Sequence, residues 1–413
     1  MEIWNGVPLF DQHGRAVNAH GAGVLEENGR YYLFGEYKTD DVNRYNGFSC
    51  YSTADFSSWR FEGLALGPQE SGLLGPGRIG ERVKVLRCPS TGRYVMLMHT
   101  DDLRYCDPVI GLAVGERIDG EFTFVGPLLY QGQPIRRWDM GTFVDDDGTA
   151  YLMTHEGDIY RLSEDYTCAE ELVVKDVAPG GESPACFKKE GVYYLLLSNK
   201  TSWERNDNYF LTAPDLHGPW TRHGLFCPEG SLTFNSQCSF VFHVNGRPVY
   251  LGDRWSFPRQ ASAATLVMLP LEAEAGRLSI RRYMPVWSPD TGEEIPLRQE
   301  QALSFCSNVK GEVCSISFGG GRLLLFGETD CRGGYADVRI SDADGNTVHT
   351  ACVDFYSLAP DAGLLYASPV LPKGGYTLTL TVSGCGGEWF KKDGTRFGST
   401  DTFVRLTGWS TIG

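Results

Sequence analysis

The sequence predicts an all-β protein in which a five-bladed β-propeller is followed by a C-terminal β-sandwich. Three observations lead to this prediction. The 413 residues include 50 glycines and 12% aromatic residues, a composition typical of tight turns and packed strands. Hairpin turns recur five times in the first two thirds of the chain. After residue 300 the pattern changes to strands with one apolar face.

Five hairpins define the predicted propeller, to which we assign residues 1–283. Each hairpin has a turn glycine followed by a strand rich in Tyr or Leu, and the glycines recur at intervals of 43 to 63 residues. Propeller blades contain about 40 to 50 residues in four strands, so these intervals fit five blades with loops. The rival architecture is an unclosed sandwich. The turn glycines are Gly29, Gly92, Gly148, Gly191 and Gly246.

The chain beyond the repeats divides into a connector and a second domain. Residues 284–300 lack the repeat and are predicted to connect the two domains. Residues 301–413 contain strands, among them 313–318, 322–326, 335–340 and 376–382, that fit a β-sandwich. Two roles stay open for this domain, sugar binding and bracing of the propeller, and the lack of a clear aromatic platform favours bracing.

Charge and cysteine content restrict the class of partner and the compartment. The 37 basic and 52 acidic residues give a formal net charge of −15, which argues against nucleic acid or an anionic membrane as partner. No apolar run approaches the roughly 18 residues of a membrane span, and the N-terminus does not resemble a signal peptide.

The twelve cysteines form no CxxC pair, and four of them lie in apolar runs (Cys186, Cys238, Cys306 and Cys314), so we expect buried free thiols and a cytoplasmic location. The sequence does not indicate an oligomeric state.

A polar residue precedes each turn glycine by nine residues, or by eleven in the second repeat. In a propeller the innermost strand of each blade lines the axis, so residues at corresponding positions meet at one mouth of the channel. Adjacent carboxylates repel and lose hydration, so such a basin is expected to do chemistry or to bind a cation rather than to pack a core. The five residues are His20, Glu81, Asp139, Glu182 and Gln237.

Three carboxylates in one basin suit glycoside hydrolysis. One acid with a raised pKa protonates the leaving oxygen, while a second group acts on the opposite side of the sugar ring. Neighbouring carboxylates raise that pKa through like-charge repulsion. A Ca²⁺ site is the alternative interpretation of these residues, because carboxylate oxygens also hold this cation. The hydrolytic reaction itself requires no cofactor, and its partner is an oligosaccharide or polysaccharide.

Several stretches, none of them specific alone, together resemble one enzyme family. They are Asn18-Ala19-His20-Gly21-Ala22-Gly23, Tyr31-Tyr32-Leu33-Phe34-Gly35-Glu36, Glu81-Arg82-Val83-Lys84-Val85, Asp139-Met140-Gly141-Thr142-Phe143, Glu182-Ser183-Pro184-Ala185, Asn235-Ser236-Gln237 and Gly252-Asp253-Arg254-Trp255. These motifs resemble glycoside hydrolase family 43 and, more narrowly, its β-1,3-galactosidase (galactan 1,3-β-galactosidase) branch. The C-terminal domain, with Asp354-Phe355-Tyr356 and Gly398-Ser399-Thr400, is similar to the appended domain of that branch.

The resemblance implies a five-bladed propeller hydrolase that inverts the anomeric centre. Matched by position, Glu182 is the general acid, and Glu81 tunes its pKa and orients it. The usual base of the family is an Asp on the first inner strand, and Asn18-Ala19-His20 stands in its place. The branch has a Gln near the attacking water, which corresponds to Gln237. Because a neutral amide is a poor base, we expect Gln237 to position the water.

Two further departures from the family pattern concern the fit of the substrate. Val83 and Ser183 stand where the family has Pro and Ala. The substrate-binding candidates are Asp139, His20, Trp138, Trp203, Asn235, Trp255 and Arg254. Most of them also have a structural interpretation: the tryptophans either stack on a pyranose or pack, Asp139 pairs with Arg136 or Arg137, His20 serves as a structural axis residue, and Arg254 pairs internally with Asp253.

The function that the resemblance implies is that of an exo-acting inverting β-1,3-galactosidase on galactan or arabinogalactan-derived oligosaccharides. An α-L-arabinofuranosidase or β-xylosidase of the same family is the alternative enzyme, because a fold does not fix a substrate. A catalytically silent carbohydrate-binding propeller is the alternative of a different class. The absence of the Asp that serves as the usual base of the family favours this alternative.

Overall fold

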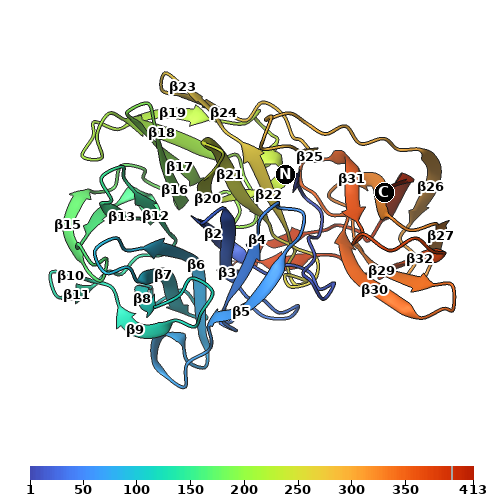
Figure 1. Ribbon diagram of the computed structural model, residues 1–413, viewed down its shortest axis with the longest axis horizontal. Helices are drawn as coiled ribbons and strands as arrows, with labels where there is room; N and C mark the ends of the chain where they lie inside the picture. Colours follow the sequence, from blue (N-terminus) through green and yellow to red (C-terminus); the bar gives the residue numbers. More distant parts are fainter. Residues whose placement is uncertain (392–393) are drawn as a thin grey trace.

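The computed structural model describes residues 1–391 and 394–413 and is almost entirely β (Figure 1). Apart from strands it contains the 3₁₀ turns η1 (Gly72–Leu74) and η2 (His155–Gly157) and the four-residue turn α1 (Leu232–Asn235). The all-β prediction is therefore confirmed. Within the described ranges, none of the helical segments has the length and apolar character needed to cross a membrane.

Five antiparallel sheets follow one another through the first 270 residues. Their strands, in chain order, are β2 (His20–Glu27), β3 (Arg30–Glu36), β4 (Phe48–Thr53) and β5 (Arg60–Leu66); β6 (Arg78–Arg87), β7 (Tyr94–Asp102), β8 (Val109–Gly115) and β9 (Thr123–Pro127); β12 (Met140–Val144), β13 (Ala150–Thr154), β14 (Ile159–Leu162) and β15 (Ala169–Val174); β16 (Glu182–Lys189), β17 (Val192–Ser198), β18 (Tyr209–Ala213) and β19 (Thr221–Leu225); and β20 (Gln237–Val244), β21 (Arg247–Arg254) and β22 (Thr265–Pro270). The short strands β10 (Leu129–Tyr130) and β11 (Gln133–Pro134) extend the third sheet beyond β15.

The first two strands of each sheet form the predicted hairpins, and local backbone geometry explains why. All five predicted turn glycines have φ between 71° and 83°. In three turns the preceding residue, Asn28, Glu190 or Asn245, is left-handed as well. Two successive residues with positive φ make the turn whose twist matches that of paired strands.

The five sheets surround a common centre, and strands β2, β6, β12, β16 and β20 lie nearest to it (Figure 1). Each of these inner strands contacts the next one in the series, and β20 contacts β2. Apolar side chains of neighbouring sheets fill the spaces between them and form separate buried cores. The starts of the five inner strands are thereby brought together.

The N-terminal segment joins the fifth sheet to the predicted connector. Strand β1 (Ile3–Trp4) pairs with β25 (Val286–Trp287), and the backbone N–H of Gly6 donates to the carbonyl of Leu266 in β22 at 2.9 Å. A small hairpin, β23 (Glu272–Glu274) and β24 (Arg277–Ser279), precedes this pairing. Residues 284–300 thus contain a short strand besides their extended chain.

The last part of the chain forms two four-stranded sheets that share one core. One consists of β26 (Gln301–Ser307), β35 (Val404–Ile412), β28 (Arg322–Thr329) and β31 (Asp361–Ala367), and the other of β27 (Val313–Phe318), β32 (Tyr376–Val382), β29 (Tyr335–Asp342) and β30 (Thr347–Asp354). The four strands predicted here are confirmed. Their alternation has the expected cause, since Leu378, Leu380 and Val382 are buried in β32 while the threonines between them are not. A separate hairpin, β33 (Glu388–Phe390) and β34 (Arg396–Gly398), projects from these sheets.

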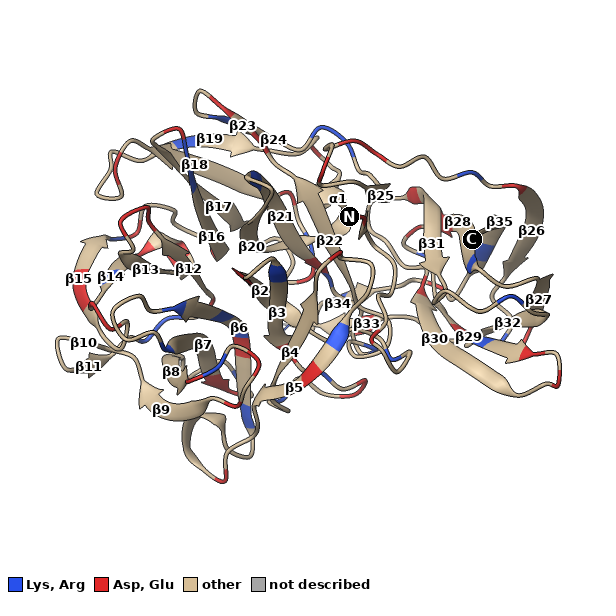
Figure 2. Ribbon diagram, in the orientation of Figure 1, with Lys and Arg blue, Asp and Glu red and all other residues tan. Residues whose placement is uncertain are grey.

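All twelve cysteines lie within the described residues and are free thiols. Cys186, Cys238 and Cys314 are buried as predicted. Cys306 is exposed, which corrects its prediction as a buried thiol, because it faces outward on β26. Acidic and basic residues are mixed over all sheets rather than gathered on one of them (Figure 2).

The close approach of the inner strands gives a first prediction. A Cβ at Gly141 in β12 would lie 2.0 Å from the carbonyl oxygen of Pro184 in β16. We expect Gly141→Ala to lower the free energy of unfolding by about 1–3 kcal/mol, because the strands must separate to admit the methyl group. Urea unfolding with fluorescence detection measures this change.

The matched control is Gly67→Ala, where a Cβ would meet nothing within 4 Å. Equal stability of the two variants would contradict the close packing of β12 on β16.

Candidate active site

A pocket of about 750 Å³ opens where the inner strands begin. Four of the five predicted basin residues line it, namely Glu81, Asp139, Glu182 and Gln237. The predicted tryptophans Trp138, Trp203 and Trp255 line it as well. The structure therefore brings together seven of the ten residues singled out in the sequence, from the second, third, fourth and fifth sheets and the loops beside them.

Backbone bulges aim additional side chains into this pocket. The pairing register of the inner strands shifts after His20, Glu81 and Glu182. The following residues, Gly21, Arg82 and Ser183, have φ of 55°, 57° and 53°. A bulge interrupts the alternation of a strand and redirects a side chain. As a result the side chains of Arg82 and Ser183 both contact the carboxylate of Asp139, which lines the pocket.

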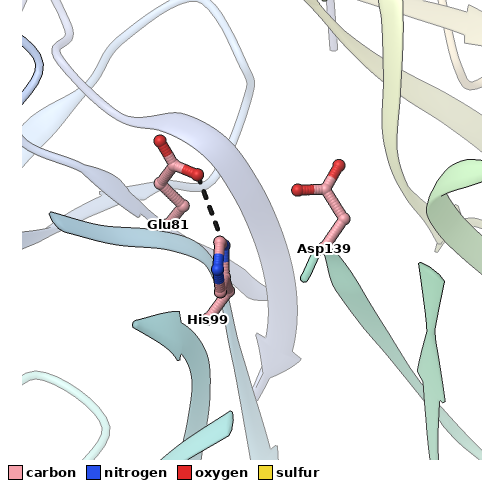
Figure 3. A group of neighbouring side chains, drawn as sticks. All are labelled: Glu81, His99 and Asp139. Carbon is pink, nitrogen blue, oxygen red and sulfur yellow. Dashed lines mark ion pairs between the residues drawn. The ribbon is translucent and has the colours of Figure 1, made fainter. Parts of the chain in front are cut away.

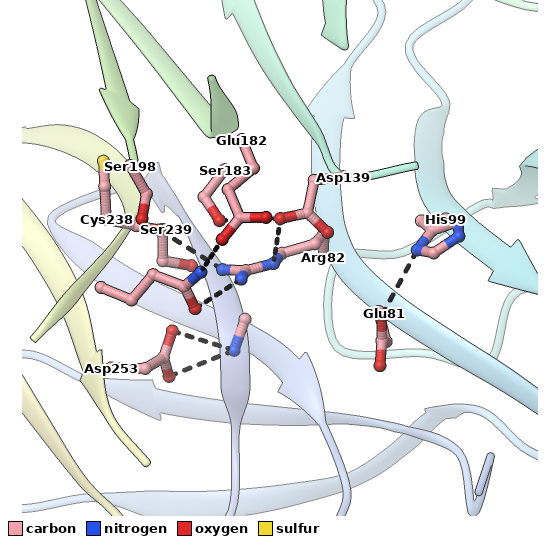
Figure 4. Close-up of polar contacts among 12 residues, drawn as sticks. Glu81, Arg82, His99, Asp139, Glu182, Ser183, Ser198, Cys238, Ser239 and Asp253 are labelled. Carbon is pink, nitrogen blue, oxygen red and sulfur yellow. Dashed lines mark hydrogen bonds and ion pairs between the residues drawn. The ribbon is translucent and has the colours of Figure 1, made fainter. Parts of the chain in front are cut away.

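Glu182 lies at the start of β16 opposite Ser198 and accepts a hydrogen bond from Gln237 Nε2 at 3.1 Å. Burial and the nearby negative charge of Asp139 raise the pKa of Glu182 to about 8. Figure 4 shows the two carboxyl groups turned toward each other. At neutral pH Glu182 is therefore mainly protonated, and the proton is lost as the pH rises through about 8.

Asp139 carries the negative charge of this pair. Burial opposes its ionisation, but the positive charges of Arg82 and His99 hold the pKa of Asp139 below its usual range. Its Oδ2 lies 3.3 Å from Arg82 Nε and accepts a hydrogen bond of 2.7 Å from the Ser183 hydroxyl. Two neighbouring carboxyl groups thus have pKa values pushed apart, as in acid–base catalytic sites.

The amide of Gln237 has a fixed orientation. Its Oε1 accepts hydrogen bonds from Arg82 Nη2 at 2.7 Å and from the Trp255 indole N–H at 2.8 Å. Its Nε2 then points to Glu182. The carbonyl oxygen, the only basic atom of the group, already has two donors.

Glu81 has a different set of partners on the far side of the basin (Figures 3 and 4). Its Oε1 accepts hydrogen bonds from Asn43 and Tyr105, and its Oε2 lies 3.4 Å from His99 Nδ1. Burial would raise the pKa of Glu81, but His99 and Lys38 hold it well below its usual range. Burial likewise disfavours charge on His99, yet Asp101 and Glu81 raise its pKa to about 9.

Glu81, His99 and Asp139 offer atoms within 4.8 Å of one another, the spacing of a metal site (Figure 3). The donor set does not fit Ca²⁺, which takes six to eight oxygen ligands. Both ring nitrogens of His99 already face carboxylates, Nδ1 at 3.4 Å from Glu81 and Nε2 at 3.3 Å from Asp101. Asp139 and Glu81 are engaged with Arg82, Ser183, Asn43 and Tyr105.

Three predicted binding residues lie outside the pocket. His20 is 1% exposed, and among the described residues its ring nitrogens have no hydrogen-bond partner; Nδ1 lies 3.7 Å from Asp253 Oδ1. Asn235 exchanges hydrogen bonds with the backbone of Ala359. Arg254 donates to the carbonyl of Phe234 and lies over the ring of Tyr283. The side chains of Asn235 and Arg254 therefore connect the fifth sheet to other segments instead of facing the pocket.

The three tryptophans differ in accessibility. Trp138 and Trp203 are 38% and 40% exposed, whereas Trp255 is 6% exposed and uses its indole N–H to hold Gln237. Trp138 and Trp203 thus have ring surface available to a ligand, and Trp255 acts through Gln237.

Several pocket residues were not identified from the sequence. They are Glu36, Lys38, Asn43, Arg82, His99, Leu103, Tyr105, His155, Lys200, Phe257, Gln260, Trp389 and Phe390. A usable signal existed for His99 and Glu36, because each stands opposite a basin residue in the neighbouring strand of its hairpin. No comparable signal existed for Trp389 and Phe390, which come from the separate hairpin β33–β34.

Comparison with known proteins gives one family. The model of glycosyl hydrolases family 43 matches residues 22–225. A proposed exo-β-1,3-galactanase from Bifidobacterium bifidum is 36% identical, with 67% of this chain and 95% of that chain covered and a TM-score of 0.62. No curated protein sequence matches significantly.

Two other solved structures extend the comparison. A β-1,3-galactosidase of the same family, solved with galactodeoxynojirimycin, is 26% identical over 69% of this chain and 99% of that chain, with a TM-score of 0.62. The exo-β-1,3-galactanase of Phanerochaete chrysosporium, solved with galactose, is 22% identical, covers 99% of both chains and has a TM-score of 0.72. The last similarity extends the shared fold to the whole chain, including the C-terminal sheets.

The two neighbouring carboxyl groups of Glu182 and Asp139 give the second prediction. In ¹³C NMR of protein labelled at the glutamate carboxyl carbons, we expect one resonance that titrates near pH 8 and disappears in Glu182→Gln. Asp139→Asn removes the neighbouring negative charge, so it should lower this pKa, although burial keeps it above the ordinary 4.5.

Asp147→Asn, in an exposed turn, serves as the control and should leave the titration unchanged. If no glutamate resonance that titrates near pH 8 in the wild type were lost in Glu182→Gln, the assignment would be contradicted; Glu204, whose pKa burial raises to about 7, should titrate in both proteins.

Proposed function

The chain belongs to glycosyl hydrolases family 43, and from this premise we propose that it is an exo-acting, inverting β-1,3-galactosidase on galactan or arabinogalactan-derived oligosaccharides. The observation that carries the proposal is a carboxyl group kept protonated beside an ionised one, at the inner end of a pocket. The sugar is inferred from the relatives, which are described as exo-β-1,3-galactanases or β-1,3-galactosidases.

The architecture that goes with this function is a five-bladed propeller of residues 1–283, a connector of residues 284–300 and a β-sandwich of residues 301–413. The successive contacts of the five inner strands, including that of β20 with β2, support the propeller. The common core of the last two sheets supports the sandwich.

Glu182 acts as the general acid in this proposal. A carboxyl group with a pKa of about 8 is protonated at neutral pH and can give its proton to the glycosidic oxygen as the bond to C1 breaks. The charge of Asp139 supplies part of the raised pKa. Glu81 acts on this pair indirectly, because its own negative charge raises the pKa of Asp139.

Gln237 positions the attacking water without accepting its proton. Its carbonyl oxygen is occupied by Arg82 and Trp255, and its Nε2 is directed toward Glu182. An amide held in this way can orient a polar ligand, but it has no free basic atom. Water attack on the face opposite the leaving oxygen inverts C1, and the proton that the attacking water loses passes to solvent in the open pocket.

The ionised carboxylates of Asp139 and Glu81 are suited to accept hydrogen bonds from sugar hydroxyl groups, and the exposed rings of Trp138 and Trp203 to pack against the C–H face of a pyranose. Protonation and water attack as described involve no cofactor.

The third prediction concerns Glu182→Gln. Wild-type protein should release galactose from β-1,3-galactobiose, and the variant should lose about 10²–10⁴-fold in kcat, because an amide cannot supply the proton. Galactose release measured with galactose dehydrogenase gives both rates. The matched control is Glu190→Gln, an exposed position in the turn of the same hairpin, which should keep wild-type activity.

The outcomes separate the candidate functions. Variant activity within about tenfold of wild type would remove Glu182 as the acid. Hydrolysis of aryl arabinofuranosides or xylosides in preference to galactobiose would identify an α-L-arabinofuranosidase or β-xylosidase. Binding of these sugars without turnover would identify a silent carbohydrate-binding propeller, an alternative favoured by the position of His20 outside the pocket.

A further inference from the structure

Exposed aromatic rings are gathered at one place on this molecule. Among residues 1–391 and 394–413, three Trp, Phe or Tyr side chains are classed as exposed, and all three line the pocket above the carboxylates. They are Trp138 (38% exposed), Trp203 (40%) and Phe390 (61%). We call these three rings the aromatic collar. Exposed apolar surface concentrated at one site marks a site of binding rather than chance.

The most exposed ring of the collar does not come from the sheets that hold the carboxylates. Phe390 ends strand β33 of the hairpin that projects from the C-terminal sheets. Its neighbour Trp389 is 8% exposed and packs against Trp203, with ring centroids 5.4 Å apart, and against Phe397 at 6.3 Å. Successive side chains of a strand point to opposite faces. Burial of Trp389 therefore leaves Phe390 directed outward beside the pocket.

The backbone around the hairpin is held by specific contacts. The N–H of Ser399 donates to the carbonyl of Gly387 at 2.8 Å, which closes the base of the hairpin. A Cβ at Gly387 would lie 2.9 Å from the carbonyl oxygen of Phe257, so the two segments are in close contact. That carbonyl accepts a hydrogen bond of 3.0 Å from the hydroxyl of Tyr335 in the C-terminal sheets. Phe257 itself lines the pocket.

We propose that the aromatic collar binds the sugar unit on the leaving-group side of the scissile bond, and that Phe390 is a specificity-determining residue supplied by the C-terminal part of the chain. The inference rests on the proposed function. A pocket of about 750 Å³ lies in the upper part of the range for small-molecule sites, which leaves room outside the carboxylates. The leaving sugar is uncharged and has an apolar C–H face, the surface that an aromatic ring buries.

The test compares two substrates that differ only in the leaving group. In β-1,3-galactobiose the leaving group is a sugar that reaches the collar, whereas in β-galactosyl fluoride it is a single atom. We expect Phe390→Ala to lower kcat/KM for galactobiose about three- to tenfold, and that for the fluoride less than about twofold. Phe390→Trp keeps a stacking face and should retain kcat/KM for galactobiose within about twofold.

Val370→Ala is the matched control, because Val370 is a similarly exposed apolar residue of the C-terminal part (66%) that does not line the pocket. It should change neither rate. An equal loss on both substrates, or no loss on galactobiose in Phe390→Ala, would overturn the proposal.

A binding experiment keeps this test separate from the proposed function. In the Glu182→Gln background, calorimetry should show tighter binding of β-1,3-galactobiose than of galactose, and Phe390→Ala should remove that difference. Equal affinities for the two sugars, or a difference in affinity that persists in Phe390→Ala, would overturn the proposal that the aromatic collar binds the leaving sugar, even if the wild-type protein hydrolyses galactobiose. Conversely, a wild-type protein inactive on both substrates would refute the β-1,3-galactosidase, while the calorimetric comparison would still show whether the aromatic collar binds the second sugar unit.

Discussion

The guanidinium group of Arg82 is the contact on which the rest of the site depends. It lies 3.3 Å from the carboxylate of Asp139, the residue that precedes the third sheet. It also donates hydrogen bonds to the side chain of Gln237 and to the carbonyl of Cys238 in the fifth sheet. The backbone N–H of Arg82 donates to the carboxylate of Glu36 in the first sheet. One buried residue therefore connects four sheets, three of them through its guanidinium group and the first through its backbone N–H. It holds the pKa of Asp139 below its usual range, and it turns the amide of Gln237 toward Glu182. The charge of Asp139 raises the pKa of Glu182, while the charge of Arg82 itself lowers it. Such a contact is possible only because Arg82 has a left-handed backbone in a bulge.

Much of the fold was predictable because it is repeated along the chain. Five turn glycines at similar intervals located the five hairpins, and alternating residues located strands such as 376–382. Counting back from each glycine also found Glu81, Asp139, Glu182 and Gln237, since equal spacing in equal hairpins brings residues to the same level of the inner strands. The same count included His20, which does not line the pocket, because its ring is buried beside Trp255 and Asp253.

What the sequence did not indicate depends on backbone irregularity and on contacts between distant segments. Simple alternation places Arg82 on the face opposite Glu81, and only the bulge brings both into one basin. Asn235 and Arg254 belong to motifs beside Gln237, yet their side chains connect to Ala359 and Phe234. Phe390 lies far along the chain from every residue of the basin, so no local pattern could assign it to the pocket. Through Phe390 the C-terminal part of the chain contributes one ring to the wall of the pocket.

The first anomer formed from β-1,3-galactobiose tests the central claim most directly, because the roles proposed for Glu182 as the acid and Gln237 as the residue that positions the water require single displacement at C1. Proton NMR recorded within the first minutes, before mutarotation, distinguishes the two anomers of the galactose released from the non-reducing end. The account predicts that this galactose first appears as the α anomer. Its first appearance as the β anomer would contradict the account, because retention requires a carboxylate nucleophile at the place assigned to the water.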